Sequence, residues 1–278
     1  MGKWFARLLI QEGFEVTISD RNKAGLAAAE KELGVGIASN IEAVKKADVI
    51  VLSVNIDSFE NVVKEISLQV EPRQVVVDVT SIKEFPVEIM HKYLKTANIL
   101  GTHPLFGPGA RDLANQNFAL TPTDETEAAL AQKVKRFLGS KGARVTLMAP
   151  HEHDAMMTVI LGLAHFVAIV AADTLAGTGK VAQTSLIGGS TYRVLTALAE
   201  SVISEDPELY ATLQMRLPGL SKLEDRLRKN AETWAGLVKR RDKKRFVHKF
   251  VALKKRFAEN NADFGQAYGN MYKIMEWL

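Results

Sequence analysis

Two short, mostly apolar segments in the first half of this 278-residue chain constrain its fold more than any other feature. They cover residues 48–54 and 74–79, and valine, isoleucine and leucine fill them without a regular alternation of polar residues. Strands of this kind are buried on both faces, as in a parallel sheet covered by helices. The segments between them have helical spacing, so the first half predicts an α/β fold with a doubly wound parallel sheet.

The alternation of strands and helices continues to about residue 149. The predicted strands are 15–19, 48–54, 74–79, 99–101, 118–120 and 143–148, and the predicted helices are 2–13, 24–33, 58–68, 86–94 and 125–139. Pro150 suits the first turn of a helix, and a long apolar helix is predicted from there to about Leu175. Helical spacing is found again from Ser190 to Leu278. We therefore predict an α/β domain over residues 1–149 and an all-helical domain over residues 150–278.

Composition narrows the class of protein. The chain has no cysteine, which excludes disulfides and thiol chemistry and fits a cytoplasmic protein. The net charge of +4 comes mainly from basic runs at 239–245 and 254–256. Nucleic-acid motifs do not accompany these runs, so we interpret them as solvated helix faces rather than a nucleic-acid site. The apolar stretch 159–172 is too short to span a bilayer, and we expect a buried helix there and no membrane association.

A dinucleotide-binding signature begins the chain. Asp20 follows the first predicted strand, where such folds place the acid that binds the adenosine ribose, about 20 residues beyond the glycine fingerprint. Asp20 lies 18 residues after Gly2, so Gly2 is assigned to the third fingerprint glycine. Ser53 and Val54 end a buried strand and are predicted to line the cofactor. Asp20 favours NAD because its carboxylate would repel a 2′-phosphate, and the adjacent Arg21 leaves NADP possible.

On this assignment the sequence does not contain the first strand and the first two glycines of the fingerprint. That strand is central in a doubly wound sheet, and each of its buried large residues contributes about 1.5–3 kcal/mol. Its loss would remove much of a total stability of about 5–15 kcal/mol. We therefore expect that Met1 is not the natural start and that a strand and a glycine-rich loop precede it. The alternative is that Gly2 is an ordinary early-helix residue and Asp20 a cap.

Polar side chains follow two neighbouring apolar strands. The stretch 78–83 reads Asp-Val-Thr-Ser-Ile-Lys, and the stretch 103–108 reads His-Pro-Leu-Phe-Gly-Pro. Because the carboxyl ends of parallel strands meet at the ligand-binding edge of the sheet, we expect Ser81, Lys83 and His103 to lie there. Two prolines and a glycine place the histidine on a stiff loop. The alternative is a structural turn with a surface histidine.

Together these motifs resemble the prephenate/arogenate dehydrogenase family along essentially the whole chain. The resemblance includes Asp20, both polar stretches, the His153-Asp154 pair, His165 and the stretch 190–193. It implies a NAD(P)-binding domain followed by a helical domain that binds substrate and forms a homodimer. It also implies prephenate dehydrogenase activity: the oxidative decarboxylation of a dicarboxylate, with hydride transfer to NAD, in tyrosine biosynthesis.

The resemblance also assigns roles. A neutral imidazole at His103 would accept the proton of the substrate hydroxyl, and Ser81 would hydrogen-bond that hydroxyl or His103. Arg193, His165 and Lys83 are the candidates for binding the substrate carboxylates. Each has an alternative: His165 as a core histidine, Arg193 as a cap of the preceding turn, and Lys83 as a solvated or structural lysine.

One departure from the family leaves the substrate open. Family members commonly carry a further arginine soon after the Arg193 position, and residues 194–204 contain none. Arg111 and Arg216 are possible substitutes. The alternatives are therefore an arogenate dehydrogenase, another β-hydroxyacid-type dehydrogenase, or a non-catalytic paralogue. The cluster His-Glu-His-Asp at 151–154 is not predicted to bind metal, because its two histidines lie on different faces of a helix.

Overall fold

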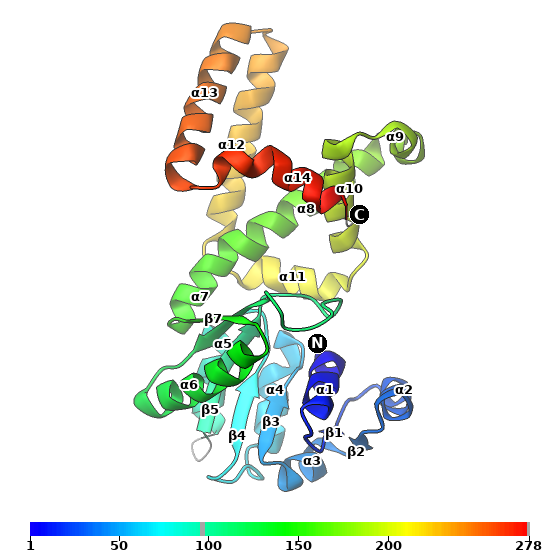
Figure 1. The fold of residues 1–278 in the computed structure, drawn as a ribbon, viewed down its shortest axis with the longest axis vertical. Helices are drawn as coiled ribbons and strands as arrows, with labels where there is room; N and C mark the ends of the chain where they lie inside the picture. Colours follow the sequence, from blue (N-terminus) through cyan, green and yellow to red (C-terminus); the bar gives the residue numbers. More distant parts are fainter. Residues whose placement is uncertain (95–97, 277–278) are drawn as a thin grey trace. The chain divides into compact units, whose positions relative to one another are not determined.

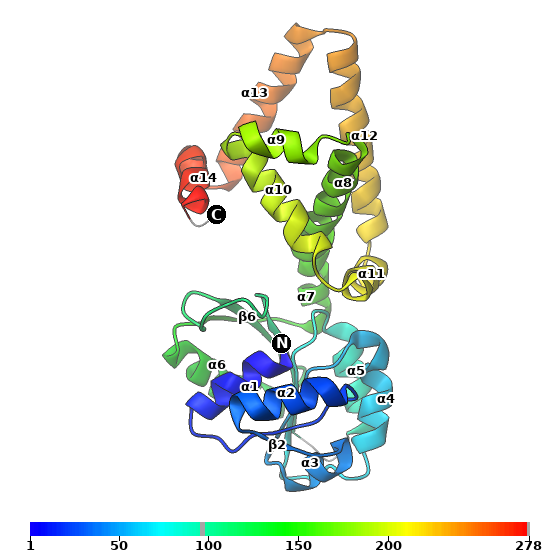
Figure 2. The same cartoon turned by 90° about the vertical axis from the view of Figure 1, so that its right-hand side faces the viewer.

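The computed structural model describes residues 1–94 and 98–276, and it divides into two compact units, Met1–Met157 and Thr158–Leu278. The last two residues of the predicted helical region lie outside the described residues. Strands and helices alternate in the first unit, and the described part of the second unit is helical (Figures 1 and 2).

The first unit contains the predicted elements and two further ones. Its strands are β1 (Thr17–Ile18), β2 (Gly36–Ile37), β3 (Val49–Leu52), β4 (Val75–Asp78), β5 (Asn98–Pro104), β6 (Asn117–Thr121) and β7 (Arg144–Leu147). Its helices are α1 (Gly2–Gln11), α2 (Lys23–Leu33), α3 (Asn40–Lys46), α4 (Ile56–Ile66), α5 (Glu84–Tyr93), α6 (Glu125–Ser140) and α7 (Pro150–Met157). The sequence analysis did not predict β2 and α3. A two-residue strand shows no periodicity, but the capping box of Ser39 and Glu42 was a readable signal for α3.

Five strands form one sheet in the order β3-β4-β5-β6-β7. Neighbouring strands are parallel, as predicted, except β5 and β6, which are antiparallel. The strand β5 also continues to Pro104, and His103 lies opposite Ala119 of β6. The histidine therefore belongs to a paired strand, not to the loop that follows it, because the returning strand supplies hydrogen-bonding partners for the end of β5.

A second, two-stranded sheet pairs β1 with β2 in parallel. In a doubly wound sheet of strand order 3-2-1-4-5-6, the first strand lies between the second and the fourth. The strands β1 and β3 stand in those two places here, and within the described residues no ladder joins them. Val49, at the start of β3, is 52% exposed.

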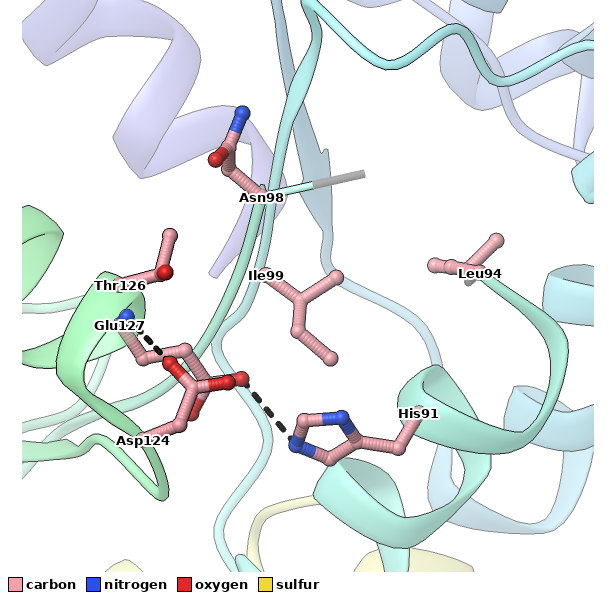
Figure 3. Close-up of a pocket in the computed structure, with 7 residues that line it drawn as sticks. All are labelled: His91, Leu94, Asn98, Ile99, Asp124, Thr126 and Glu127. Carbon is pink, nitrogen blue, oxygen red and sulfur yellow. Dashed lines mark hydrogen bonds and ion pairs between the residues drawn. The ribbon is translucent and has the colours of Figure 1, made fainter. Parts of the chain in front are cut away.

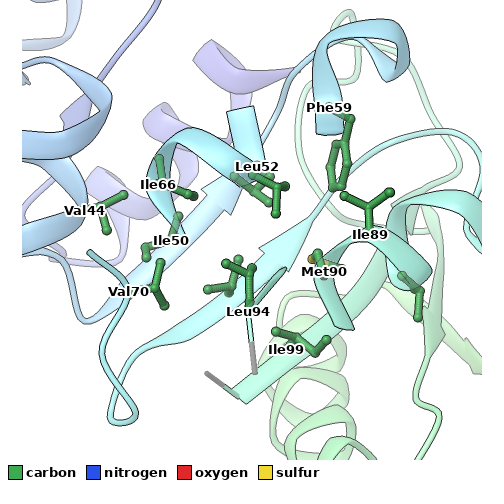
Figure 4. Close-up of a cluster of buried hydrophobic side chains, with 13 residues drawn as sticks. Val44, Ile50, Leu52, Phe59, Ile66, Val70, Ile89, Met90, Leu94 and Ile99 are labelled. Carbon is green, nitrogen blue, oxygen red and sulfur yellow. The ribbon is translucent and has the colours of Figure 1, made fainter. Parts of the chain in front are cut away.

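Both faces of the five-stranded sheet are covered by helices, as the apolar strands predicted. Alternate residues of a strand point to opposite faces, so Ile99 of β5 packs with α4 and α5 while Leu100 packs with α1 and α6. Figure 4 shows the first of these two cores, which includes Phe59 and Met90. Phe59, Met90 and Leu100 are fully buried. The fold class predicted from the sequence is confirmed.

Replacing Gly101 with alanine is expected to destabilise the first unit. A β-carbon there would lie 2.5 Å from Val87 Cγ2 and would also overlap Thr121 Oγ1, and both neighbours are short side chains in the packed core. Overpacking of this kind costs about 1–3 kcal/mol of unfolding free energy, which urea denaturation would measure. Gly139→Ala is the control, because nothing lies within 4 Å of its added β-carbon. Equal stability of the Gly101→Ala and parent proteins would contradict this packing.

The second unit begins within a continuous helical run. Its elements are a π-helical turn (Thr158–Leu163), α8 (Ala164–Gly177), α9 (Val181–Ile187), α10 (Ser190–Ile203), α11 (Pro207–Arg216), α12 (Leu220–Lys239), α13 (Lys243–Asn260), a 3-10 turn (Phe264–Gln266) and α14 (Ala267–Met275). By length and composition alone, the run Pro150–Gly177 is apolar enough to cross a membrane, and only 22% of its most apolar window is buried. The expectation of a buried helix is therefore wrong for the single chain. Leu186 and Ile187 on α9 are also more than four-fifths exposed.

Candidate active site

The imidazole of His103 is buried in the first unit, with 4% of the residue exposed. Its Nδ1 atom lies 2.9 Å from Nε2 of His153 on α7, and the two rings meet edge to face with centroids 5.0 Å apart. His153 is itself completely buried, and its Nδ1 atom lies 2.7 Å from Oδ1 of Asp154. The structure therefore brings a histidine from the sheet and a histidine–aspartate pair from a helix into one chain of hydrogen bonds.

Asp154 also links α7 to α5. Its Oδ1 accepts a hydrogen bond of 2.7 Å from the backbone N–H of Lys83, and its Oδ2 accepts one of 3.0 Å from that of Glu84. These amides belong to the start of α5, where backbone donors lack helical partners and a negative charge is favourable. Asp154 therefore caps α5 from another helix and fixes the position of His153 relative to the sheet.

Lys83 and Asp78 form a buried ion pair in the same unit as His103. The ammonium of Lys83 pairs with Asp78 at the end of β4 and donates a hydrogen bond of 2.5 Å to the carbonyl of Thr102, and both ionic side chains are fully buried. Asp78 also accepts hydrogen bonds from Thr80 and from the backbone of Thr102. Burial lowers the pKa of Lys83, and Asp78 opposes that effect. The ammonium is occupied within the sheet, so the structure favours the structural alternative for Lys83 over a contact with substrate.

The surroundings of His103 favour its neutral form. Burial lowers the pKa of His103 well below its ordinary value, and the nearby His153 and the charge of Lys83 act in the same direction. The ring is therefore uncharged near pH 7, as a proton acceptor must be. Ser81 follows β4 at the same edge of the sheet and is partly exposed. The structure thus places the two predicted catalytic residues at the ends of neighbouring strands.

The residues predicted to bind the cofactor lie around α1 and the end of β3. A β-carbon on Gly2 would lie 3.4 Å from Ser53 Oγ, so the first turn of α1 lies against the residue that follows β3, with Val54 next in the chain. Asp20 and Arg21 are exposed just after β1, and Asp20 Oδ1 accepts a hydrogen bond of 2.8 Å from the backbone N–H of Asn22. A helix N-terminus and an acid after the adjacent strand are the groups that bind pyrophosphate and ribose, so these residues fit a dinucleotide.

His165 and Arg193 belong to the second unit. His165 is partly buried, its ring packs edge to face on Tyr210 at 4.8 Å, and burial lowers its pKa. Its Nδ1 atom is buried without a hydrogen-bond partner in the described part of the chain. Arg193 is exposed in the first turn of α10, where its backbone N–H donates to the carbonyl of Gly189. A buried ring nitrogen and an exposed guanidinium both remain suited to an anionic ligand.

Sequence reasoning gave no role to three residues that the structure joins to this site. Asp78 and His153-Asp154 were part of the family motifs, yet neither received a function. The signal was present: an aspartate ending a buried strand and a histidine–aspartate pair opening a helix place charge in what must become an interior. The partner of Asp78 is nearby, at position 83, but the partners of His153 and Asp154 lie 50 and 71 positions away.

The pocket in Figure 3 is a different feature. It has a volume of about 140 Å³ and lies at the start of β5, between Asn98 and Ile99 on one side and His91 and Glu127 on the other. His91 Nε2 lies 3.1 Å from Glu127 Oε1 in it. His103 lies four positions beyond Ile99 along the strand, which is about 13 Å at 3.3 Å per residue. The pocket is therefore remote from the predicted catalytic histidine.

The α/β sheet covered on both faces, with a buried histidine at one strand end and an acid after β1, defines a nucleotide-binding protein of the dehydrogenase type. Residues 5–147 match the family described as "Prephenate dehydrogenase, nucleotide-binding domain", and residues 149–252 match "Prephenate dehydrogenase, dimerization domain". The chain belongs to the prephenate dehydrogenase family, and the resemblance stated from the sequence is confirmed.

Individual relatives agree with this assignment. The chain is 33% identical over 251 residues to the "Probable arogenate/prephenate dehydrogenase" of Methanocaldococcus jannaschii. This match covers 89% of this chain but only 56% of the Methanocaldococcus protein. The fold is that of a prephenate dehydrogenase from Aquifex aeolicus crystallised with hydroxyphenyl propionate and NAD+, with a TM-score of 0.75, 24% identity and coverage of 94% and 95% of the two chains. For a Synechocystis arogenate dehydrogenase the TM-score is 0.69 and the identity is 19%, with coverage of 93% of this chain and 95% of that chain.

Proposed function

We propose that this chain carries an NAD-dependent prephenate dehydrogenase, which converts prephenate to 4-hydroxyphenylpyruvate in tyrosine biosynthesis. The observation that carries the proposal is the buried His103 near the end of β5, 2.9 Å from His153, with Ser81 following the neighbouring strand β4. Family membership and the names of the relatives support the reaction class. The chain spans little more than half of the Methanocaldococcus protein, so the activity of the whole protein is part of this proposal.

The reaction needs a group that holds one proton for a short time. As the hydride leaves C4 of the cyclohexadienol ring, the C4 hydroxyl gives its proton to Nε2 of His103, and the oxygen becomes a carbonyl. Loss of the ring carboxylate as carbon dioxide then returns an electron pair to the ring, and the resulting phenolate takes the proton back. Atoms and charge balance with NAD+ as the acceptor of the hydride. Ser81 is assigned the hydrogen bond that orients the hydroxyl or His103.

The cofactor is NAD, which when bound accepts the hydride. Asp20 would hold the adenosine ribose, the N-terminus of α1 at Gly2 would hold the pyrophosphate, and Ser53 and Val54 would line the site. Arg21 is exposed beside Asp20, so NADP is the second cofactor to test.

The substrate is a dicarboxylate, and we assign its carboxylates to Arg193 and His165. Arginine binds carboxylates in a fork, and the unpartnered Nδ1 of His165 offers one further hydrogen bond. Arogenate is the second candidate substrate, because the relatives include a protein named arogenate/prephenate dehydrogenase and an arogenate dehydrogenase. The two substrates differ in the side chain, where arogenate carries an amine.

We also propose a cytoplasmic homodimer formed through the helical unit. The matched family description for residues 149–252 is a dimerization domain. The apolar side chains exposed on that unit, such as Leu186 and Ile187, are the kind of surface that a second copy would cover.

The test is a dehydrogenase assay followed at the NADH absorbance band. We expect NADH and carbon dioxide in equal amounts with prephenate, and the rates with arogenate and with NADP set the order of preference. A higher kcat/KM with arogenate would reassign the substrate. Turnover only of another β-hydroxyacid would move the chain to the wider dehydrogenase class. NAD binding without any turnover would favour the non-catalytic paralogue and would overturn the proposed function.

A further inference from the structure

The hydrogen-bond directions behind His103 follow from Asp154. A backbone N–H can only donate, and the amides of Lys83 and Glu84 donate to Oδ1 and Oδ2 of this carboxylate. Both carboxylate oxygens therefore act as acceptors, and the Nδ1 atom of His153, 2.7 Å from Oδ1, must be the donor. In neutral His153 the proton on Nδ1 leaves Nε2 as the nitrogen with a lone pair.

The same reasoning passes to the next ring. Nε2 of His153 lies 2.9 Å from Nδ1 of His103, and since it has a lone pair, Nδ1 of His103 must carry the hydrogen between them. In neutral His103 this leaves Nε2 as the unprotonated nitrogen. Free histidine ordinarily favours neither arrangement strongly enough to fix it, so the environment decides the tautomer.

We propose that Asp154 and His153 form a relay that holds His103 in the Nδ1–H tautomer and shares the proton that His103 accepts. The proposal rests on the function proposed above. When the substrate hydroxyl gives its proton to Nε2 of His103, the Nδ1 proton of His103 can move to Nε2 of His153. The positive charge then lies beside the carboxylate of Asp154, and the reverse transfer returns the proton to the phenolate.

The charges around the two rings explain why the relay is needed. The positive charge of Lys83 lies close enough to His103 to disfavour a positive charge on the His103 ring. His153 is completely buried, so solvent cannot stabilise its charged form, and Asp154 is the adjacent carboxylate. His153 and Asp154 are positioning residues because they act through His103. The cap that Asp154 places on α5 accounts for its contacts with the amides, but not for the pairing of the two rings.

The first test is the protonation of the ring nitrogens, measured by nitrogen-15 NMR of histidine-labelled full chain at neutral pH. The chain has six histidines, and His103→Asn and His153→Gln assign the two that matter. We expect both rings in the Nδ1–H form. A proton on Nε2 of His103 would overturn the proposal. This readout needs no turnover, so it remains decisive even if the dehydrogenase assay fails and the proposed function is wrong.

Two variants of His153 separate orientation from proton sharing. In His153→Gln an amide oxygen can still accept the Nδ1–H of His103 but cannot take a proton, so we expect the His103 tautomer to persist and kcat to fall about 10-fold. In His153→Leu the acceptor is gone. We expect the His103 proton to move to Nε2 and kcat to fall about 10²-fold or more, with little change in KM.

Asp154→Asn tests the charge. We expect kcat to fall about 10²-fold or more, because an amide cannot stabilise a protonated His153. The control is Glu152→Gln on the same helix, because Glu152 is exposed and accepts a hydrogen bond from the backbone N–H of the nearby Ala149. Thermal unfolding of every variant identifies simple loss of fold. Folded His153→Leu and Asp154→Asn proteins with unchanged kcat, or with an unchanged His103 tautomer in His153→Leu, would refute the relay.

Discussion

Replacing His103 with asparagine is expected to lower kcat by about 10²–10⁴-fold, the range that a general base contributes. The asparagine amide can take the place of Nδ1 and still donate to His153, but it has no counterpart to Nε2. The ion pair of Lys83 and Asp78 and the contact of His153 with Asp154 should therefore stay in place, and NAD binding should be unchanged. Steady-state kinetics and NAD titration by calorimetry measure the two effects.

The pH dependence of the parent protein checks the same assignment. Because burial, His153 and Lys83 lower the pKa of His103, the base stays deprotonated as pH falls through 6.5, and activity should persist below that pH. The pKa of His103 is lower in the folded protein than in the unfolded chain. The contribution of His103 to the free energy of unfolding is therefore complete above about pH 6.5 and is lost as pH falls toward the pKa of the folded state. Urea unfolding of His103→Asn should show a smaller acid loss. Turnover that is retained in this variant would refute the role of His103 as base.

Removing one member of the buried ion pair has the second large expected effect. In Lys83→Met, the carboxylate of Asp78 would remain in the interior without its cation, and breaking such a pair costs about 3–5 kcal/mol of unfolding free energy. That is a large fraction of the stability of an ordinary domain. The measurement is the free energy of unfolding in urea, and we expect the variant to be strongly destabilised or unfolded.

A double variant shows whether the effect comes from the unpaired charge. Lys83→Met with Asp78→Asn leaves no isolated charge, so it should be more stable than Lys83→Met alone. The surface control is Lys64→Met, whose exposed pair with Glu60 should matter far less. If Lys83→Met is as stable as the parent protein and only raises KM for the dicarboxylate, Lys83 is a substrate ligand after all.

Asp20 follows β1 and Gly2 begins α1, and both are predicted from the sequence to hold the dinucleotide. Among the described residues no ladder joins the two sheets. Spacing alone led to this assignment, because the distance from a fingerprint glycine to the ribose-binding acid is set by one helix and one turn.

The end of β5 and the surroundings of Lys83 both depend on contacts with neighbouring strands. The end of β5 was predicted as loop because Pro104 breaks a strand pattern, yet proline is tolerated at a strand end, and β6 supplies the pairing. Lys83 is a candidate for the substrate because a dicarboxylate needs a cationic partner, and a structural lysine is the stated alternative. Its burial depends on Asp78, five positions away, and on the carbonyl of Thr102 on the next strand, which spacing alone does not indicate.

The sequence by itself determined the α/β character of the first unit, the helical character of the second, and the family, because periodicity and short motifs are local properties of the chain. It also placed Ser81 and His103 at neighbouring strand ends. Only the tertiary structure decided the direction of β6, the burial of Lys83 and the alignment of His103 with His153 and Asp154. These depend on contacts between residues up to 71 positions apart, and local sequence carries no record of which distant groups will share an interior.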